Sequence, residues 1–247
     1  MSHHFLQFDD VRYSYPDGHE ALRGVSFTLR HGEKAALVGM NGAGKSTLLL
    51  HADGLLLPSG GRVVMGGITV TRKTLPIVRQ TVGLVFQDAD NQLFMPTVGE
   101  DVAFGPANMG LTSEEIGERV TRALRAVGAE ALRDAAPYRL SGGQKKTAAI
   151  AAVLAMEPSI LVMDEPTSNL DPRARRQIID LLARFDHTML IATHDMDMIP
   201  DLCPRTIVMH EGRIAADGDT QSIFADSRLL EACGLERPCR MKYAPTR

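Results

Sequence analysis

Apolar and polar residues alternate through the first thirty positions of the chain. Apolar side chains occupy every second position around Leu6–Phe8 and again over Val25–Leu29, and Pro16-Asp17-Gly18 lies between these segments. Alternation with a period of two is typical of strands that bury one face, and Pro-Asp-Gly favours a turn. We therefore expect antiparallel strands of a small sheet here.

Later segments have a different pattern, in which apolar residues follow one another without alternation. Examples are Ala35–Val38, Ile160–Met163 and Met189–Ala192. Such runs are typical of parallel strands covered on both faces. A helix is predicted over Arg173–Arg184, between the last two runs, so these segments indicate an α/β unit. Further short strands are expected at 62–65 and 81–86, and a hairpin from 207–210 and 213–216.

The pattern becomes helical between 88 and about 156. One helix is predicted to begin at Thr112 or Ser113, both of which suit an N-cap, and to end at Gly128. Ser141 is a candidate cap for another helix, which continues through a series of small apolar residues. We interpret this stretch as an inserted helical lobe.

Composition and charge narrow the possible functions. The chain has 247 residues and a formal net charge of −3, with basic and acidic residues interspersed. This balance provides no basic field for DNA or RNA, so nucleic acid is disfavoured as the main ligand. The 3 cysteines are odd in number and lack C-x-x-C spacing, which argues against a disulfide framework or a zinc site. The longest candidate membrane span, 148–156, is about half of the ~20 residues that a helix needs to cross a bilayer.

The segment after Ala35–Val38 is the motif around which the chain is organised. It reads Gly39-Met40-Asn41-Gly42-Ala43-Gly44-Lys45-Ser46-Thr47, so G-x-x-x-x-G-K-[ST] occurs between a strand and a helix. Its glycines let successive N–H groups turn inward at the positive end of the helix, where they bind phosphate. We expect Lys45 to contact the β- and γ-phosphates and the Ser46 hydroxyl to coordinate Mg²⁺. The predicted nucleotide-binding residues are Gly39, Asn41, Gly42, Ala43, Gly44, Lys45, Ser46 and Thr47. Kinases, GTPases, helicases and transport motors share such a loop, so the rest of the chain must decide between them.

Polar residues that suit catalysis follow three of the predicted strands. Asp164 and Glu165 end one strand, and because successive strand residues point to opposite faces, we expect Asp164 to face Mg²⁺ and Glu165 to polarise an attacking water. His194 is expected at the same sheet edge, where its imidazole contacts the γ-phosphate. Gln87 is expected to ligate Mg²⁺ and to couple the site to whatever the helical lobe contacts.

A second phosphate-seeking segment is Leu140-Ser141-Gly142-Gly143-Gln144. Its serine and glycines lie at a predicted helix N-terminus, where exposed N–H groups and the helix dipole favour an anion. One nucleotide cannot easily use both surfaces from a single chain. We therefore expect a dimer in which Ser141, Gly142, Gly143 and Gln144 of each chain contact the nucleotide of the other.

Together these motifs resemble those of ATP-binding-cassette (ABC) ATPases. The matches are Gly39–Thr47 to Walker A, Leu140–Gln144 to the signature motif, Ile160–Glu165 to Walker B, Ser168–Asp171 to the D-loop, Gln87 to the Q-loop and His194 to the switch histidine. Tyr15 matches the aromatic residue that stacks on adenine, with Tyr13 as a substitute. The resemblance implies an α/β P-loop NTPase fold with a RecA-like core, a small antiparallel β-subdomain and an inserted helical subdomain. It places a nucleotide-binding domain at 5–220, with the helical subdomain at about 88–157, and a short C-terminal extension at 221–247.

The sequence after Gln87 resembles a narrower group, the ATPases of energy-coupling-factor (ECF) transporters. Val82–Phe94, the continuation to Pro106, and Leu230–Pro238 carry this resemblance. In that group the residues after the Q-loop glutamine form a short extra helix that meets a transmembrane coupling protein. Leu154–Pro158 and the short chain resemble the cobalt or nickel branch. The resemblance implies ATP and Mg²⁺ as cofactors, and a peripheral location at the cytoplasmic face of the membrane. The implied partners are a second ATPase subunit, in a homodimer, a transmembrane coupling protein and a substrate-binding membrane protein.

Three positions depart from the usual ABC pattern, and two other functions share the motifs. Met40 replaces a frequent proline, Thr147 stands where an arginine usually follows the signature motif, and Asn169 occupies a D-loop position that is usually small. A conventional ABC transporter ATPase for another solute would share every motif except the sequence after Gln87. A soluble ABC ATPase acting on DNA or ribosomes usually has long coiled coils or two cassettes, which this chain lacks.

Overall fold

The computed structural model describes residues 5–242, and the chain divides into two units. The first unit contains the residues up to 79 and those from 186 onward, and the second contains 80–185. We describe each unit by itself. The predicted domain bounds at 88–157 and 220 stay predictions.

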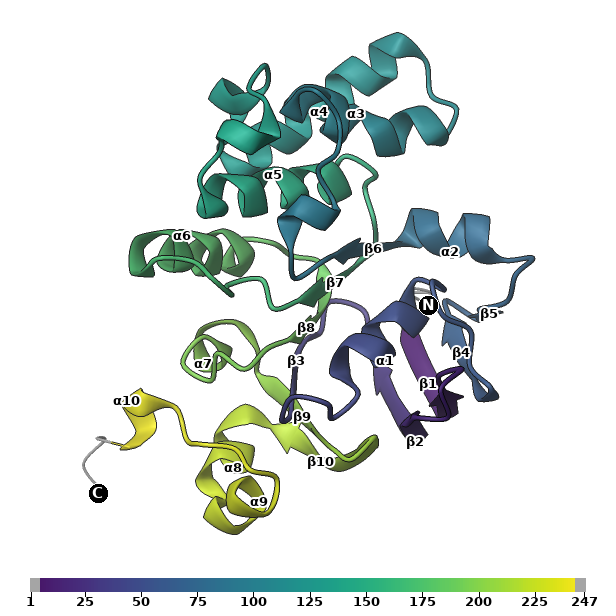
Figure 1. The fold of residues 1–247 in the computed structure, drawn as a ribbon, viewed down its shortest axis with the longest axis vertical. Coiled ribbons are helices and arrows are strands. Elements are labelled where there is room, and N and C mark those ends of the chain that lie inside the picture. Colours follow the sequence, from purple (N-terminus) through teal and green to yellow (C-terminus); the bar gives the residue numbers. More distant parts are fainter. Residues whose placement is uncertain (1–4, 243–247) are drawn as a thin grey trace. The chain divides into compact units, whose positions relative to one another are not determined.

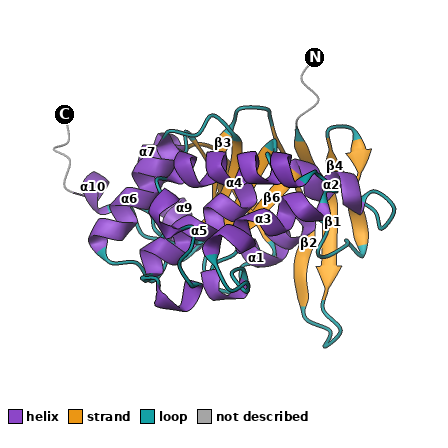
Figure 2. Ribbon diagram, turned by 90° about the horizontal axis from the view of Figure 1, so that it is seen from above, coloured by secondary structure: helices purple, strands orange, loops and turns teal. Residues whose placement is uncertain are grey.

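The strands of the first unit belong to two sheets. One is small and antiparallel, and the other is mostly parallel. The antiparallel sheet has the order β2-β1-β4-β5, and β1, β2 and β4 lie side by side in Figure 2. Its strands are β1 (Leu6–Ser14), β2 (Glu20–Leu29), β4 (Gly60–Met65) and β5 (Ile68–Thr69). In the other sheet, β3 (Lys34–Val38) pairs in parallel with β8 (Thr188–Ala192) and β9 (Arg205–His210), and β10 (Arg213–Asp219) is antiparallel to β9. The predicted antiparallel strands, buried strands and hairpin are confirmed.

Short helices complete the first unit. They are α1 (Lys45–Ala52), α2 (Leu75–Thr81), which crosses into the second unit, α7 (Ile199–Leu202), α8 (Thr220–Ala225), α9 (Ser227–Ala232) and α10 (Cys239–Lys242). The sequence pattern predicted none of these except α1. The other helices have four to seven residues and make fewer than two turns, so their periodicity is too short to recognise.

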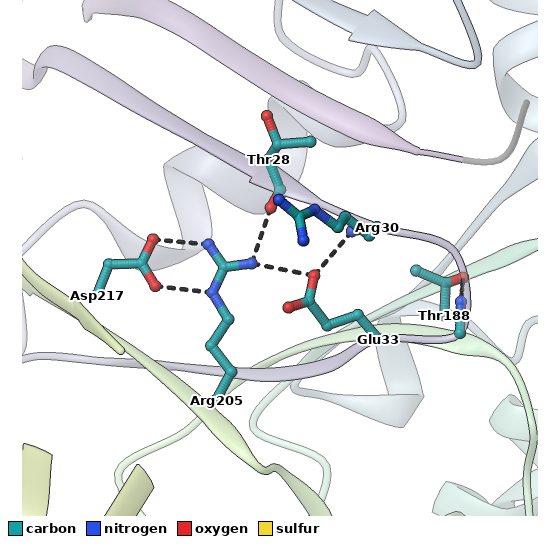
Figure 3. A network of polar contacts seen from close by, with 7 residues as sticks. Thr28, Arg30, Glu33, Thr188, Arg205 and Asp217 are labelled. Atoms are coloured by element: carbon teal, nitrogen blue, oxygen red, sulfur yellow. Dashed lines mark hydrogen bonds and ion pairs between the residues drawn. The ribbon is translucent and has the colours of Figure 1, made fainter. Parts of the chain in front are cut away.

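A network around Arg205 joins both strands of the β9–β10 hairpin to the end of β2 and to the β2–β3 connection (Figure 3). The Nε and Nη2 atoms of Arg205 donate to the two carboxylate oxygens of Asp217 at 2.7 and 2.6 Å. Nη1 donates to the Thr28 carbonyl oxygen at 2.8 Å and to Glu33 at 3.0 Å. The bonds to Asp217 and Glu33 raise the pKa of Arg205. This planar cation therefore holds β10 close to the chain that leads into β3.

The second unit contains two parallel strands and a group of helices. The strands are β6 (Val82–Val85) and β7 (Ile160–Asp164), and the helices are α3 (Val98–Asn108), α4 (Ser113–Val127), α5 (Gly142–Leu154) and α6 (Pro172–Ala183), with 3₁₀ turns at Ala89–Asn91, Glu130–Leu132 and Pro137–Arg139. Figure 1 shows α3, α4 and α5 gathered together. Their shared core contains Val102, Val120 and Leu124 against alanines of α5. Gly83 of β6 allows α5 to pack closely against this strand, since a Cβ there would lie 2.3 Å from the Val153 side chain.

The helix ends in the second unit follow local sequence rules. Thr112 is the N-cap of α4: its side chain accepts from the Glu115 N–H at 3.3 Å, while the Glu115 carboxylate accepts from the Thr112 N–H at 2.8 Å. The sequence pattern alone does not decide whether Thr112 or Ser113 is the N-cap. Gly128 ends the helix with a left-handed φ of 68°, as predicted. Across the residues 5–242, we find no helix with the length and hydropathy of a membrane span.

Candidate functional site

The phosphate loop connects β3 to α1 and requires glycine for two separate reasons. Gly42 and Gly44 have φ values of 81° and 100°, a region that residues with a Cβ rarely adopt. Gly39 and Gly44 also lie close to backbone: a Cβ at Gly39 would be 2.4 Å from the Met209 carbonyl oxygen, and one at Gly44 would be 2.6 Å from that of Ala21. The loop is therefore fixed by both conformation and packing.

Lys45 lies inside the curve of this loop. Its Nζ donates to the carbonyl oxygens of Gly39 at 2.7 Å and Met40 at 3.1 Å, and the residue is buried. Ser46 is exposed in the first turn of α1, which carries no acidic side chain. An anionic ligand is favoured here by three features: the buried Lys45 ammonium, the two glycines with left-handed backbone, and a first helical turn without an acidic side chain.

Tyr15 contacts the same helix through its hydroxyl, which lies 3.0 Å from Oγ1 of Thr47. The Tyr13 ring lies edge-on to both Tyr15 and His51, with centroid distances of 5.1 and 4.8 Å. His51 is buried in α1 with Nδ1 2.7 Å from the Thr47 carbonyl oxygen, and burial lowers its pKa. The Tyr15 ring in turn stacks on His19 with a centroid distance of 6.4 Å, so each tyrosine has two ring neighbours, and the assignment of Tyr15 to adenine stays a prediction.

His194 leaves the parallel sheet at the same end as the phosphate loop. Leu37 of β3 pairs with Ala192 of β8, and the Thr193 N–H donates to the Leu37 carbonyl oxygen at 3.1 Å. Because both strands run the same way, the loop after Val38 and the loop containing His194 start at one sheet edge. His194 is exposed there.

The second unit holds its own set of predicted residues at one strand end. Val85 of β6 pairs in parallel with Met163 of β7, so Gln87 and the Asp164–Glu165 pair lie at the carboxyl ends of neighbouring strands. Gln87 is exposed, Asp164 is half-buried and Glu165 is 6% exposed.

The position of Glu165 differs from the one that the strand pattern predicts. Strand alternation predicts that Asp164 and Glu165 point to opposite faces, but β7 ends at Asp164 and Glu165 has a left-handed φ of 47°. Its carbonyl oxygen accepts from the Ser168 N–H at 3.2 Å and the Ser168 hydroxyl at 3.0 Å, which closes a turn. Strand alternation therefore does not set the direction of the Glu165 side chain, because a local turn over residues 165–168 replaces the strand there. Strained non-glycine backbone of this kind often occurs at functional sites.

The signature segment begins α5 with a reciprocal cap. The Ser141 hydroxyl accepts from the Gln144 N–H at 3.3 Å, and the Gln144 side chain accepts from the Ser141 N–H at 2.9 Å. Gly143 allows α5 to approach α6, because a Cβ there would lie 2.7 Å from the Cβ of Ala174. Gly142 is exposed, and a Cβ there would make only ordinary contacts at 3.7 Å or more. Gly143 thus has a packing reason for being glycine that Gly142 lacks.

Two of the departures from the family pattern have local explanations. Asn169 has a left-handed φ of 58°, a conformation that asparagine tolerates better than most residues. The Thr147 hydroxyl donates to the Gly143 carbonyl oxygen at 2.9 Å within α5.

Lys146, which precedes Thr147, is a buried cation that the sequence pattern does not indicate. Its position next to Lys145 concealed it, since a lysine pair on a helix is usually solvent-exposed.

Met40 meets the C-terminal part of the chain. A Cβ at Gly234, which follows α9 with a φ of 64°, would lie 2.3 Å from the Met40 sulfur atom. The extension therefore contacts the phosphate loop directly.

Comparison with known proteins agrees with these motifs. The ABC transporter family matches residues 22–168, which is more than half of the chain. The energy-coupling factor transporter ATP-binding protein EcfA of Methanococcus maripaludis is 48% identical over 238 residues, covering 94% of this chain and 86% of its own.

Two solved structures have the same fold. The structure of cbiO1 from Clostridium perfringens, described as part of the ABC transporter complex cbiONQ, has a TM-score of 0.82 and 42% identity, covering 93% of this chain and 94% of its own. A dimeric ATP-binding cassette in a post-hydrolysis state, bound to ADP and phosphate, has a TM-score of 0.79 and 28% identity, covering 87% of this chain and 98% of its own. The predicted P-loop NTPase fold of the ABC type is therefore confirmed, and the chain belongs to the ABC transporter family, whose ATP-binding subunits hydrolyse ATP to drive transport.

Proposed function

We propose that this chain is the ATPase subunit of an ECF-type importer for Co²⁺ or Ni²⁺, acting at the cytoplasmic face of the membrane. The observation that carries the ECF assignment is its 48% identity to an EcfA protein over 94% of the chain. The likeness to cbiO1, which belongs to a transporter complex, agrees with it. The resemblance of Leu154–Pro158 to the cobalt and nickel branch supports Co²⁺ or Ni²⁺ as the transported solute.

In this proposal, the first unit binds the nucleotide. Backbone N–H groups of Gly39–Thr47 and the Lys45 ammonium hold the β- and γ-phosphates, and Tyr15 stacks on adenine. Lys45 exchanges its two carbonyl contacts within the loop for the phosphates. His194, at the same sheet edge, donates to the γ-phosphate and orients the attacking water.

The second unit supplies the carboxylates and Gln87. Ser46, Gln87 and Asp164 offer a hydroxyl, an amide and a carboxylate, which are the oxygen donors that Mg²⁺ prefers, and would hold it. When bound, Mg²⁺ neutralises phosphate charge during phosphoryl transfer. Glu165 then accepts a proton from the attacking water. Its enclosure at the end of β7 limits its movement, which suits a group that must meet water in one orientation.

A second copy of the chain completes each site. The exposed Ser141, Gly142 and Gln144 at the start of α5 contact the nucleotide of the partner chain, with the helix dipole directed at its phosphates. The dimeric cassette with ADP and phosphate supports such an assembly. ATP binding closes the dimer, and hydrolysis reopens it.

An exposed aromatic pair in the second unit supports a membrane protein partner. Phe94 and Phe104 are 63% and 42% exposed, and their rings meet edge-on at 4.9 Å. The N–H groups of Phe94 and Met95 both donate to Asp101 at 2.9 and 3.0 Å, so this apolar surface has a fixed backbone. Fixed, exposed aromatic side chains are typical anchors of protein interfaces. We assign them to the transmembrane coupling protein, which in turn holds the substrate-binding membrane protein.

Transport assays test this proposal directly. The chain is coexpressed with candidate membrane partners, and uptake of labelled Co²⁺, Ni²⁺ and a vitamin panel is compared. We expect Co²⁺ or Ni²⁺ uptake that disappears with Glu165→Gln, a variant that still binds ATP. Uptake of vitamins alone would overturn the assignment of Co²⁺ or Ni²⁺ as the solute. ATP hydrolysis near the normal rate in Glu165→Gln would overturn the proposed role of Glu165.

A further inference from the structure

Helix α5 carries two neighbouring lysines that bind the segment after β6 in different environments. Lys146 is 2% exposed, and its Nζ donates to the carbonyl oxygen of Gln87 at 2.6 Å and to that of Phe86 at 3.2 Å. Lys145 instead forms a surface ion pair with Asp90 at 2.6 Å. The buried lysine therefore holds the backbone of the Q-loop glutamine itself.

The same segment is tied to α5 by a second side chain. The Gln92 Oε1 atom accepts from the Phe86 N–H at 3.2 Å, and its Nε2 atom donates to the Ala149 carbonyl oxygen of α5 at 2.8 Å. Both backbone polar groups of Phe86 are thus bonded to α5 directly or through Gln92. A shift of α5 relative to β6 would move the backbone of Gln87 with it.

Packing alone does not explain a lysine at this position. Burying an ammonium is costly unless it is hydrogen-bonded or paired, and the neighbouring residues of α5, Ala148–Ile150, are apolar. Burial lowers the pKa of Lys146, and the negative charges of Asp88, Asp164 and Glu165 oppose that shift. The ammonium therefore lies in the field of the carboxylates that end β7.

We propose that Lys146 is a positioning residue for Gln87. By fixing the Gln87 carbonyl, it sets the point from which the glutamine side chain reaches the reacting groups. It also makes the signature helix and the Q-loop move as one body. The inference rests on the role proposed above for Gln87 in hydrolysis, and it is independent of the membrane partner and the solute.

Steady-state ATP hydrolysis by the full chain tests this role. Lys146→Met keeps the length of the side chain but removes its donors, so kcat should fall by about tenfold or more. The dissociation constant for ADP should change by less than about twofold, because its phosphates are assigned to Gly39–Thr47, whereas Lys146 binds the backbone of Gln87. Lys146→Arg, which can still donate to both carbonyl oxygens, should recover most of the rate. Lys145→Met is the matched control: it removes from the same helix an ion pair whose lysine is 21% and whose aspartate is 63% exposed, and kcat should stay within about twofold of the original.

A double-mutant cycle with Gln87→Ala separates positioning from mere structure. If Lys146 acts through Gln87, adding Lys146→Met to Gln87→Ala should slow hydrolysis by less than about twofold, although it slows the unchanged protein about tenfold. If the two effects multiply, the inference is wrong and the proposed role of Gln87 stands. If Gln87→Ala alone hydrolyses ATP at the normal rate, that role is wrong and the inference fails with it. Tm is measured for every variant, and Lys146→Gln, a shorter neutral donor, replaces the methionine variant in the cycle should that variant not fold.

Discussion

The hydroxyl of Tyr15 lies 3.0 Å from Oγ1 of Thr47, so the aromatic residue assigned to adenine is bound to the first turn and a half of the phosphate-loop helix. This contact orients the ring before any nucleotide arrives. Preorientation reduces the entropy that the side chain loses when a base stacks on it. The ring and the hydroxyl should therefore make separable contributions to ATP binding.

Tyr15→Phe and Tyr15→Ala measure these contributions. The phenylalanine variant loses one hydrogen bond, whose net value is about 0.5–1.5 kcal/mol, so it should bind ATP only a few times more weakly than the original. The alanine variant also loses base stacking, worth about 1–3 kcal/mol, and should bind at least about tenfold more weakly. Calorimetric titration with ATP provides the affinities. Unchanged affinity in Tyr15→Ala would remove Tyr15 from the adenine site.

The two glycines of the signature segment should respond differently to alanine. Gly143→Ala places a Cβ 2.7 Å from that of Ala174, and such overpacking costs about 1–3 kcal/mol, which should lower Tm. Gly142→Ala meets nothing closer than 3.7 Å and should leave Tm nearly unchanged. Because Gly142 is assigned to the nucleotide of the partner chain, its variant should nevertheless hydrolyse ATP more slowly. Normal hydrolysis by Gly142→Ala would contradict the proposed contact across the dimer.

These examples indicate how far the sequence could predict the site. Motif spacing and capping rules act over a few residues, which is why the phosphate loop, α1, a cap at Thr112 or Ser113 and the Ser141 cap could be predicted. The left-handed φ of Glu165 depends on a turn closed by Ser168, and a strand pattern carries no information about it. Lys146 of α5 binds the segment after β6, 60 residues away in the chain. Contacts of that separation leave no local periodicity to read.

Asp53 should make stability depend on pH. It is buried at the end of α1, and desolvation raises its pKa from 3.8 to about 6, although its carboxylate accepts from the Leu55 N–H at 3.0 Å. The folded state therefore binds the proton more tightly than the unfolded state does. The favourable contribution of the neutral acid is complete below about pH 4 and is lost as the pH rises through about 6.

Asp53→Asn keeps an acceptor for the Leu55 N–H without the charge. At pH 7.5 it should be more stable than the original protein by about 1–3 kcal/mol, and the difference should vanish near pH 4. Urea unfolding midpoints at a series of pH values measure this. A difference that stays constant with pH would show that ionisation of Asp53 is not its cause.

The contact between Gly234 and Met40 should connect the C-terminal extension to nucleotide binding. Gly234→Ala would bring a Cβ within 2.3 Å of the Met40 sulfur atom and must displace that side chain, which belongs to the phosphate loop. We expect ATP affinity to fall severalfold. The position also has a φ of 64°, so part of the change in Tm will come from backbone strain alone.

Gly67→Ala is the control for that strain, because Gly67 has a φ of 87° in the same unit and no atom within 4 Å of an added Cβ. It should lower Tm comparably while ATP affinity stays unchanged. Met40→Ala combined with Gly234→Ala removes the displaced side chain and should restore affinity without restoring Tm. If the double variant binds ATP as weakly as Gly234→Ala, then the extension does not act on the loop through Met40. Recovery would show that the extension and the phosphate loop are coupled through this one contact, so that changes after α9 can alter nucleotide binding without touching the nucleotide.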